Sequence, residues 1–309
     1  MVALLFYSEV DDGEAWRREL MRRLPGLEVR LWPDLGDPKG IEAALVWRPP
    51  RGLLASLPAL KAVFSLGAGV DDLLADPTLP DVPLCRMVDP SLVATMGDFL
   101  LAVALYYHRE FDRYAELQRA CRWQTRLPRP LAETRVGVMG LGEIGAPVAE
   151  RLRDAGFTVR GWSRTRRSLA GVACFAGATE RDAFLAEVDV LVCLLPLTPE
   201  TRGVLDAELF ARLPAGAALV HVGRGGHLVE EDLLDALDRG HLRGAWLDTV
   251  PFEPLDADHP FWRHPRIRIT PHVAGYGLPE TGAAFVADNL QRLRDGRPLR
   301  GLVDRARGY

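Results

Sequence analysis

A short apolar segment that ends in a glycine-rich turn constrains this chain more than any other feature. Residues 135–139 have the pattern of a buried strand, and Gly140, Gly142 and Gly145 then follow with the spacing G-x-G-x-x-G. An amphipathic helical pattern begins directly afterwards, with Pro147 in its first turn, where no N–H partner is needed. In such a turn the second glycine lets the backbone approach a pyrophosphate, and the third lets helix and strand pack closely. The segment predicts a dinucleotide-binding turn, and a chance cluster of glycines in an ordinary turn is the alternative.

Composition sets the broad class of the protein. The 309 residues, 48% hydrophobic and 26% charged, suit two globular domains. A net charge of −4 offers no field that would attract nucleic acid. The four cysteines are far apart and lack metal-ligand spacing, so we interpret them as free thiols of a reducing compartment. The N-terminal apolar run is too short for a signal peptide, and we expect no segment of membrane-spanning length. These features predict a cytoplasmic protein with no membrane, nucleic-acid or metal partner.

Strand and helix patterns alternate along the whole chain, which predicts an α/β fold with two parallel sheets. In the first half we expect strands over 2–7, 27–32, 43–47 and 62–66 and a helix over 15–24. In the second half we expect a long helix over 99–121, then strands over 158–162, 188–195, 217–222, 244–248 and 266–270. One more helix follows Ala283. Since a C-terminal helix often returns to the first domain, we predict one discontinuous domain, 1–98 plus 280–309, and a cofactor domain over 99–279.

The strand after the glycine turn indicates which dinucleotide is bound. Proteins that bind NAD place an acidic residue about twenty residues beyond the glycines, where it holds the ribose 2′-hydroxyl. Here that strand ends in Ser163, Arg164, Thr165 and Arg166, with no acidic side chain. A hydroxyl and guanidinium groups would suit a 2′-phosphate. We therefore predict that NADPH is preferred over NADH, and a solvated basic turn is the alternative.

Two strand ends in the first half are candidate substrate contacts, because ligands of open α/β sheets bind at the carboxyl ends of strands. Trp47 directly follows one apolar strand, and Leu66, Gly67, Ala68 and Gly69 follow another. Main-chain N–H groups near glycines can bind a small anion such as a carboxylate. A packed aromatic ring and an ordinary turn are the alternatives.

Arg224, Glu253 and His272 follow three strands of the second half and form a candidate catalytic set. Taken singly, each also suits an ordinary surface or loop residue. Together they suit reduction of a 2-keto acid: Arg224 would hold the carboxylate and polarise the ketone, His272 would donate a proton, and Glu253 would orient the imidazole.

Several segments, in this order, resemble the D-isomer-specific 2-hydroxyacid dehydrogenases. They are residues 67–71, the glycine turn, Arg224-Gly225, Glu253-Pro254-Leu255 and Thr270-Pro271-His272. The strand ends near Trp47 and Ser163 and the C-terminal residues 303–309 are most similar to the A-type glyoxylate/hydroxypyruvate reductases. The resemblance covers essentially the whole chain. It implies two doubly wound parallel-sheet domains, a Rossmann-type cofactor domain and a smaller flavodoxin-like substrate domain, with a cleft between them.

The resemblance also implies NADPH as donor, a small 2-keto acid as substrate and a homodimer formed through the cofactor domain. The substrate carboxylate would bind Arg224 and the backbone at Ala68 and Gly69. Further candidate cofactor contacts are Leu141, Glu143, Ile144, Leu195, Pro196, Thr201, Val222, Gly223 and Asp248. One departure is His221, where the family usually has Asn three residues before its arginine.

The predicted reaction is the reduction of glyoxylate and hydroxypyruvate to glycolate and D-glycerate. A dehydrogenase of a bulkier D-2-hydroxy acid is one alternative, and a non-catalytic dinucleotide-binding regulator is the other.

Overall fold

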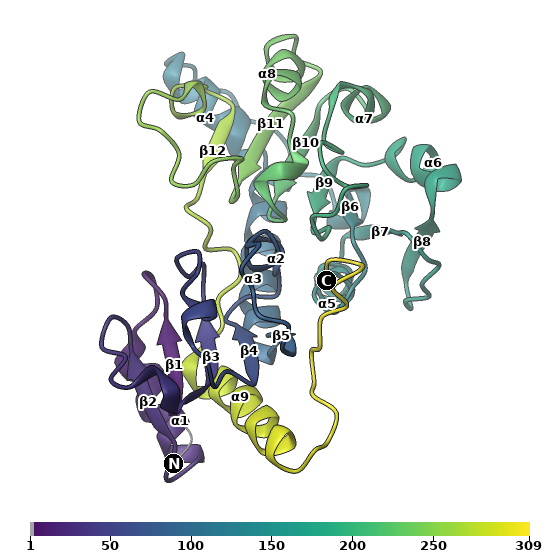
Figure 1. The fold of residues 1–309 in the computed structure, drawn as a ribbon. Coiled ribbons are helices and arrows are strands. Elements are labelled where there is room, and N and C mark those ends of the chain that lie inside the picture. The colour runs from purple at the N-terminus through teal and green to yellow at the C-terminus, as the bar shows by residue number, and fades with distance from the viewer. Residues whose placement is uncertain (1–2) are drawn as a thin grey trace. The chain divides into compact units, whose positions relative to one another are not determined.

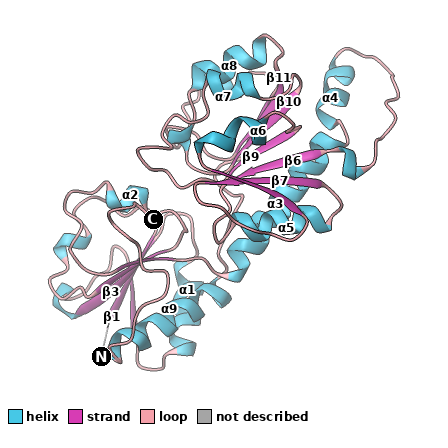
Figure 2. Ribbon diagram, turned by 90° about the vertical axis from the view of Figure 1, so that its right-hand side faces the viewer, coloured by secondary structure: helices cyan, strands magenta, loops and turns pink. Residues whose placement is uncertain are grey.

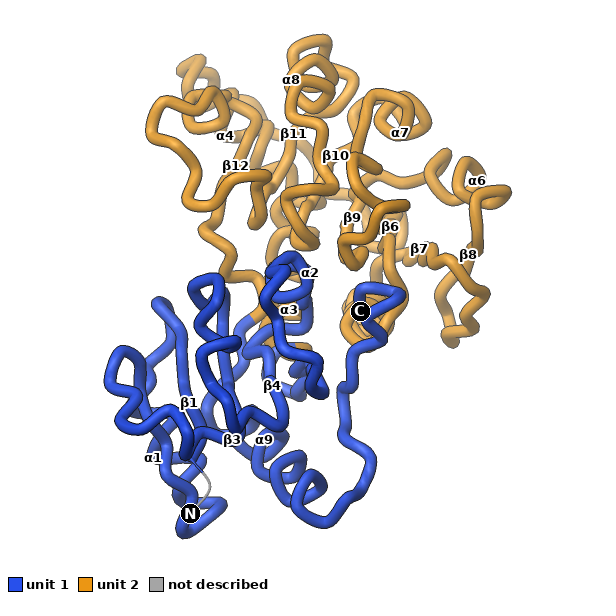
Figure 3. Tube along the Cα trace, in the orientation of Figure 1, with its two compact units in different colours: residues 1–92, 276–309 blue, residues 93–275 orange. Residues whose placement is uncertain are grey.

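The computed structural model describes residues 3–309, which form two compact units (Figure 3). Unit 1 consists of the described residues up to Leu92 together with Tyr276–Tyr309, and unit 2 of Val93–Gly275. The units divide at 92/93 and 275/276, whereas we expected 98/99 and 279/280. Helix α3 (Pro90–His108) leaves unit 1 soon after it begins, and its buried residues from Met96 onward belong to the core of unit 2.

Unit 1 contains a five-stranded parallel sheet in the order β2-β1-β3-β4-β5, a flavodoxin-like order (Figure 1). Its strands are β1 (Ala3–Tyr7), β2 (Glu28–Leu31), β3 (Ile41–Val46), β4 (Ala62–Ser65) and β5 (Leu84–Arg86). Its helices are α1 (Gly13–Arg23), α2 (Asp71–Leu74) and α9 (Pro279–Arg294). The four strands expected here are present within the described residues, and Val2 lies outside them. β5 was not expected, because three residues are too few for a recognisable pattern.

Helices α1 and α9 pack side by side in unit 1, although they come from opposite ends of the chain (Figure 2). Asp12 caps α1 by accepting hydrogen bonds from the main-chain N–H groups of Glu14 and Ala15. The buried Trp16 of α1 lies against Gly282 of α9, where any Cβ would overlap its ring. The glycine therefore allows the C-terminal helix to pack closely against the N-terminal one.

Unit 2 contains a seven-stranded parallel sheet in the order β12-β11-β10-β9-β6-β7-β8. Its strands are β6 (Arg135–Met139), β7 (Thr158–Ser163), β8 (Val172–Ala176), β9 (Val190–Cys193), β10 (Ala217–His221), β11 (Leu242–Leu247) and β12 (Ile267–Ile269). Besides α3, its helices are α4 (Phe111–Arg119), α5 (Gly145–Asp154), α6 (Arg181–Leu185), α7 (Ala207–Arg212) and α8 (Glu230–Asp238). The first six strands follow the Rossmann order, and β12 extends one edge. Strand order reverses between β6 and β9, where ligands of such sheets bind.

Alternate residues of the central strands in unit 2 point to two hydrophobic cores. In β9, Leu191 and Cys193 belong to the core formed with α6, α7 and α8, whereas Val190 and Val192 belong to the core formed with α3 and α5. Helices thus cover both faces of the sheet, which is why these strands are almost continuously apolar.

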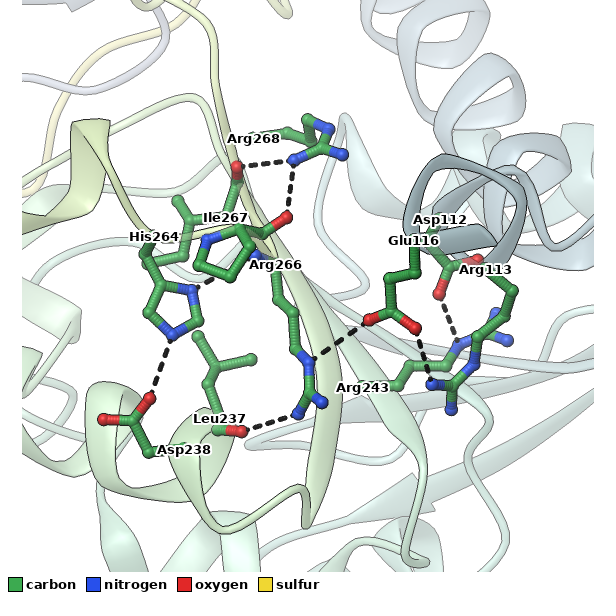
Figure 4. Close-up of polar contacts among 11 residues, drawn as sticks. Asp112, Arg113, Glu116, Leu237, Asp238, Arg243, His264, Arg266, Ile267 and Arg268 are labelled. Atoms are coloured by element: carbon green, nitrogen blue, oxygen red, sulfur yellow. Dashed lines mark hydrogen bonds and ion pairs between the residues drawn. The ribbon is translucent and has the colours of Figure 1, made fainter. Parts of the chain in front are cut away.

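The single helix expected over 99–121 is wrong. Two helices occupy this region, α3 and α4, and the chain turns at Glu110, which has a φ of 56°. Ion pairs then fix α4 to the edge of the sheet: Asp112 pairs with Arg243 of β11 at 3.6 Å (Figure 4). Glu116 pairs with Arg266, beside β12, at 3.3 Å. These contacts from distant residues stabilise a turn that the local pattern does not indicate.

Among residues 3–309, the 19-residue α3 is long and apolar enough to span a membrane by length and composition, although Asp98 interrupts its apolar run. Its apolar side chains have another explanation. Leu100, Val103, Ala104 and Tyr107 are buried in a core of unit 2. We therefore interpret α3 as a core helix.

Candidate functional site

The glycine turn lies at the carboxyl end of β6, next to the reversal in strand order. Gly140 has a φ of 105°, which favours glycine, and a Cβ there would lie 2.7 Å from the carbonyl oxygen of Leu194. A Cβ on Gly145 would overlap the carbonyl oxygen of Gly140. Close packing within the protein thus requires both glycines.

Gly142 differs from its two neighbours, because a Cβ there would meet no protein atom within 4 Å. Its φ is not positive either, so neither sterics nor backbone conformation within the protein requires a glycine. A pyrophosphate that approaches the backbone would require one. The turn therefore fits a dinucleotide, with Leu141 buried beneath it and Glu143 and Ile144 leading into α5.

The residues expected to select the cofactor lie at and just beyond the end of β7. The Ser163 hydroxyl donates to the carbonyl oxygen of Thr165 at 2.8 Å, and Arg164 is exposed. Arg166 instead forms an ion pair with Glu180 and donates to the carbonyl oxygen of Cys174 at 3.1 Å. The guanidinium of Arg166 thus has partners within unit 2, and the side chain of Arg164 lies exposed next to it in the sequence.

The loops after β9 and β10 carry most of the remaining candidate cofactor contacts. Leu195 and Pro196 follow β9, and the Thr201 hydroxyl donates to the carbonyl oxygen of Pro196 at 2.7 Å. Val222 and Gly223 follow β10, and the N–H of Val222 bonds to the carbonyl of Cys193 at 3.3 Å. Thr201 therefore stabilises the conformation of the first loop.

Arg224, Glu253 and His272 follow the adjacent strands β10, β11 and β12, so unit 2 presents them at one edge of its sheet. Nδ1 of His272 lies 2.9 Å from Oε2 of Glu253, and both side chains are largely buried. An ionised carboxylate only accepts hydrogen bonds, so Nδ1 carries the hydrogen. Nε2 is therefore the ring atom that can donate a proton elsewhere.

Hydrogen bonds and close packing link the three strand ends. Gly225 packs so closely against Val250 that a Cβ on Gly225 would overlap the Val250 carbonyl. The main-chain N–H of Val250 donates a hydrogen bond to Oε1 of Glu253 at 3.3 Å. Asp248, expected as a cofactor contact, accepts hydrogen bonds from the Thr270 hydroxyl at 2.7 Å and from the N–H groups of Val273 and Ala274 at 2.9 Å. Asp248 thereby holds the loop that carries His272.

In unit 1, Trp47 and Gly67 come from neighbouring strand ends and are in contact. A Cβ on Gly67 would overlap the six-membered ring of Trp47, and the Arg48 guanidinium lies 5.3 Å from the centre of the indole. Arg48 has a φ of 44° and pairs with Asp72 at 2.8 Å. The indole is therefore fixed between a glycine and a held cation.

The turn after β4 exposes main-chain donors. The buried Leu66 bonds back to Val46, and the N–H of Gly67 donates to the Ser65 hydroxyl at 3.2 Å. Among residues 3–309, no group accepts a hydrogen bond from the N–H of Ala68 or Gly69, and both residues are half-buried. Two such N–H groups can bind a carboxylate.

Residues 101–274 match the model of the D-isomer-specific 2-hydroxyacid dehydrogenase NAD-binding domain, which covers more than half of the chain. The chain belongs to this family. It is an oxidoreductase, and it has the dinucleotide-binding domain that the glycine turn predicted.

Full-length relatives of this dehydrogenase agree with that assignment. The chain is 44% identical to glyoxylate/hydroxypyruvate reductase A of Serratia proteamaculans over 312 residues, 99% of each protein. A 2-hydroxyacid dehydrogenase of Xanthobacter autotrophicus Py2, solved with NADPH and MES, is 44% identical with a TM-score of 0.95, covering 100% of this chain and 99% of that one. The NADPH-dependent glyoxylate/hydroxypyruvate reductase of Sinorhizobium meliloti, solved with NADP and sulfate, is 37% identical with a TM-score of 0.93, covering 100% of both chains.

Sequence reasoning did not identify two features of this dehydrogenase site. One is the role of Asp248 in holding the His272 loop. The other is His227, which accepts a hydrogen bond from the main chain of Arg224. His227 ends a short 3₁₀ turn (Gly225–His227) that directly follows Arg224. In the sequence, only its position three residues after Arg224 indicates a contact between them.

Proposed function

We propose that this protein reduces small 2-keto acids such as glyoxylate and hydroxypyruvate to 2-hydroxy acids, with NADPH as the donor. The observation that carries the proposal is the Glu253–His272 pair at 2.9 Å, beside the strand end that carries Arg224. The family and the full-length reductase relatives support the same reaction.

Each group has a defined task in this proposal. Arg224 binds the substrate carboxylate. Within unit 1, the N–H groups of Ala68 and Gly69 are a further candidate for binding a carboxylate. The guanidinium of Arg224 also polarises the ketone. When it is bound, NADPH supplies the hydride to the carbonyl carbon. Nε2 of His272 donates a proton to the carbonyl oxygen, while Glu253 fixes the other ring nitrogen and stabilises the charged imidazole.

The residues present also support a preference for NADPH. The turn after β7 offers the Ser163 hydroxyl and the exposed Arg164, and no acidic residue stands where NAD would require one. Gly140, Gly142 and Gly145 would lie along the pyrophosphate. Leu195, Pro196, Thr201, Val222, Gly223 and Asp248 would line the rest of the dinucleotide site.

A direct assay tests the reaction. Purified protein is mixed with a panel of 2-keto acids and either NADPH or NADH, and the absorbance of the reduced nicotinamide is followed. We expect turnover of glyoxylate and hydroxypyruvate and a lower KM for NADPH. Faster turnover of phenylpyruvate would favour a bulkier substrate. Tight NADPH binding with no turnover of any keto acid would favour a regulator.

We also propose a homodimer formed through unit 2. The segment after α4 is held by Tyr114, whose hydroxyl bonds to the main chain of Arg126, and by an ion pair between Arg126 and Glu110. On this ordered segment Trp123 is 101% and Leu127 is 89% exposed. Large exposed apolar side chains on a fixed segment indicate an interface, and a second copy of this chain is the occupant that we propose.

Sedimentation velocity tests the dimer. Trp123→Asp combined with Leu127→Asp should convert a dimer into a monomer. Val10→Asp, at a position 73% exposed in unit 1, is the matched control and should leave the dimer intact. A monomeric wild type would contradict the proposal.

We further propose a cytoplasmic location, supported by four cysteines that are all free thiols.

A further inference from the structure

Two buried histidines hold the peptide groups on either side of the Arg224 α-carbon. Nε2 of His221 lies 2.9 Å from the carbonyl oxygen of Arg224, and the N–H of Arg224 donates to Nδ1 of His227 at 3.1 Å. Both histidines are completely buried, and their rings meet edge to face at 5.6 Å. The main chain of Arg224 is therefore fixed from both sides by side chains.

The partners determine which ring nitrogens carry hydrogen. A carbonyl oxygen only accepts, so Nε2 of His221 must donate; a main-chain N–H only donates, so Nδ1 of His227 must accept. Nε2 of His227 then donates to the carbonyl oxygen of Pro196 at 3.2 Å. His227 thus connects the Arg224 loop to the loop after β9.

These hydrogen bonds also bear on metal binding. Cys193, His221 and His227 place one possible ligand atom each within 4.8 Å of one another. Both ring nitrogens of His227 are engaged, which leaves only Nδ1 of His221 and the thiol of Cys193. Two ligands are fewer than a stable protein site for a soft metal ion uses. Burial also raises the pKa of Cys193 to about 12, so the thiol stays protonated.

We propose that His221 and His227 are positioning residues, which orient Arg224 for the substrate carboxylate by fixing its main chain. This inference rests on the role proposed for Arg224 above. His221 stands where the family usually has Asn, and its longer side chain brings a donor to the Arg224 carbonyl. Burial lowers the pKa of His221 to about 3, so it acts as a neutral donor throughout the neutral range.

The test compares His221→Gln with His221→Leu. Glutamine carries an N–H donor at the same number of bonds from Cα as Nε2 of histidine, whereas leucine has no donor. We expect His221→Leu to raise the KM for glyoxylate and the Ki of the unreactive carboxylate oxamate about tenfold, the usual effect of one lost hydrogen bond. The KM for NADPH should change little, and His221→Gln should restore most of the loss.

Three further readouts separate positioning from other roles. The pH profile of His221→Gln should coincide with that of the wild type; a shifted profile would mean that His221 titrates during turnover and would overturn the proposal. A lower Tm for His221→Leu with an unchanged glyoxylate KM and oxamate Ki would assign His221 to stability alone and would also overturn it. His227→Asn keeps an acceptor for Arg224 but loses the donor to Pro196, so it should raise the KM for NADPH more than that for glyoxylate.

Arg224→Gln distinguishes failure of the proposed substrate-binding role of Arg224 from failure of the positioning role of the two histidines. If Arg224→Gln leaves the glyoxylate KM and the oxamate Ki unchanged, the proposed role of Arg224 fails, and the positioning role fails with it. If Arg224→Gln weakens both while His221→Leu weakens neither, only the positioning role fails.

Discussion

The two units carry different kinds of candidate binding and catalytic groups. Unit 1 offers main-chain N–H groups at Ala68 and Gly69 and an indole, Trp47, packed against a glycine. Unit 2 offers side chains, Arg224 and the His272–Glu253 pair, and this pair joins the ends of two neighbouring strands. Main-chain donors and a fixed ring can bind and select a substrate, whereas proton transfer requires a titratable side chain. We infer that changes in unit 1 act mainly on KM and changes at the catalytic pair mainly on kcat.

The largest effect is expected at His272. His272→Ala removes the proton donor, so kcat should fall by about 10² to 10⁴, the usual contribution of a placed acid or base. NADPH binding, followed by fluorescence titration, should stay near the wild-type value. A variant that keeps most of its turnover would remove His272 from the mechanism and return the Glu253–His272 pair to a structural role.

The next effect concerns the two arginines after β7. Arg164→Ala should raise the KM for NADPH about 10- to 100-fold, because it loses hydrogen bonds between charged groups. The KM for NADH should hardly change. Arg166→Ala serves as the matched variant, with a smaller effect, since Arg166 already pairs with Glu180. Equal effects on NADPH and NADH at Arg164 would contradict selection of the 2′-phosphate.

Glu253→Gln should lower kcat for glyoxylate reduction, but by less than His272→Ala does. Glutamine can still accept a hydrogen bond from Nδ1 of His272, so the ring stays oriented, but glutamine lacks the negative charge that stabilises a charged ring. Steady-state assays of the two variants measure the difference. A Glu253→Gln enzyme with the wild-type kcat would mean that Glu253 only holds the loop.

The smallest effect is expected in unit 1 and tests the contact between Gly67 and Trp47. Gly67→Ala must displace the indole, so the KM for glyoxylate should rise a few-fold while kcat is largely kept. The three atoms nearest to a Cβ added at Gly67 all belong to the Trp47 ring. Gly67→Ala should therefore have little further effect in a Trp47→Ala background, a double-mutant cycle that isolates this contact. Trp47→Ala should also admit bulkier keto acids.

Local pattern was sufficient for much of the fold. The residues of β10 form a continuous buried run, and α9 buries residues at helical spacing. The glycine spacing at 140–145 predicted the dinucleotide-binding turn at the right strand. Arg224, Glu253 and His272 were predicted to follow successive strands, and the structure places them after β10, β11 and β12. Such features depend on residues that are close in sequence, so the sequence alone determines them.

Other features required the tertiary structure, because they depend on contacts between residues far apart in the chain. The break between α3 and α4 is stabilised by Arg243 and Arg266, which the local helical pattern does not include. Glu180 became the partner of Arg166, and Asp248 the partner of the His272 loop, only when separate strand ends were brought together. The sequence determined which chemical groups this protein carries, whereas tertiary contacts decided which of those groups already have partners inside the fold.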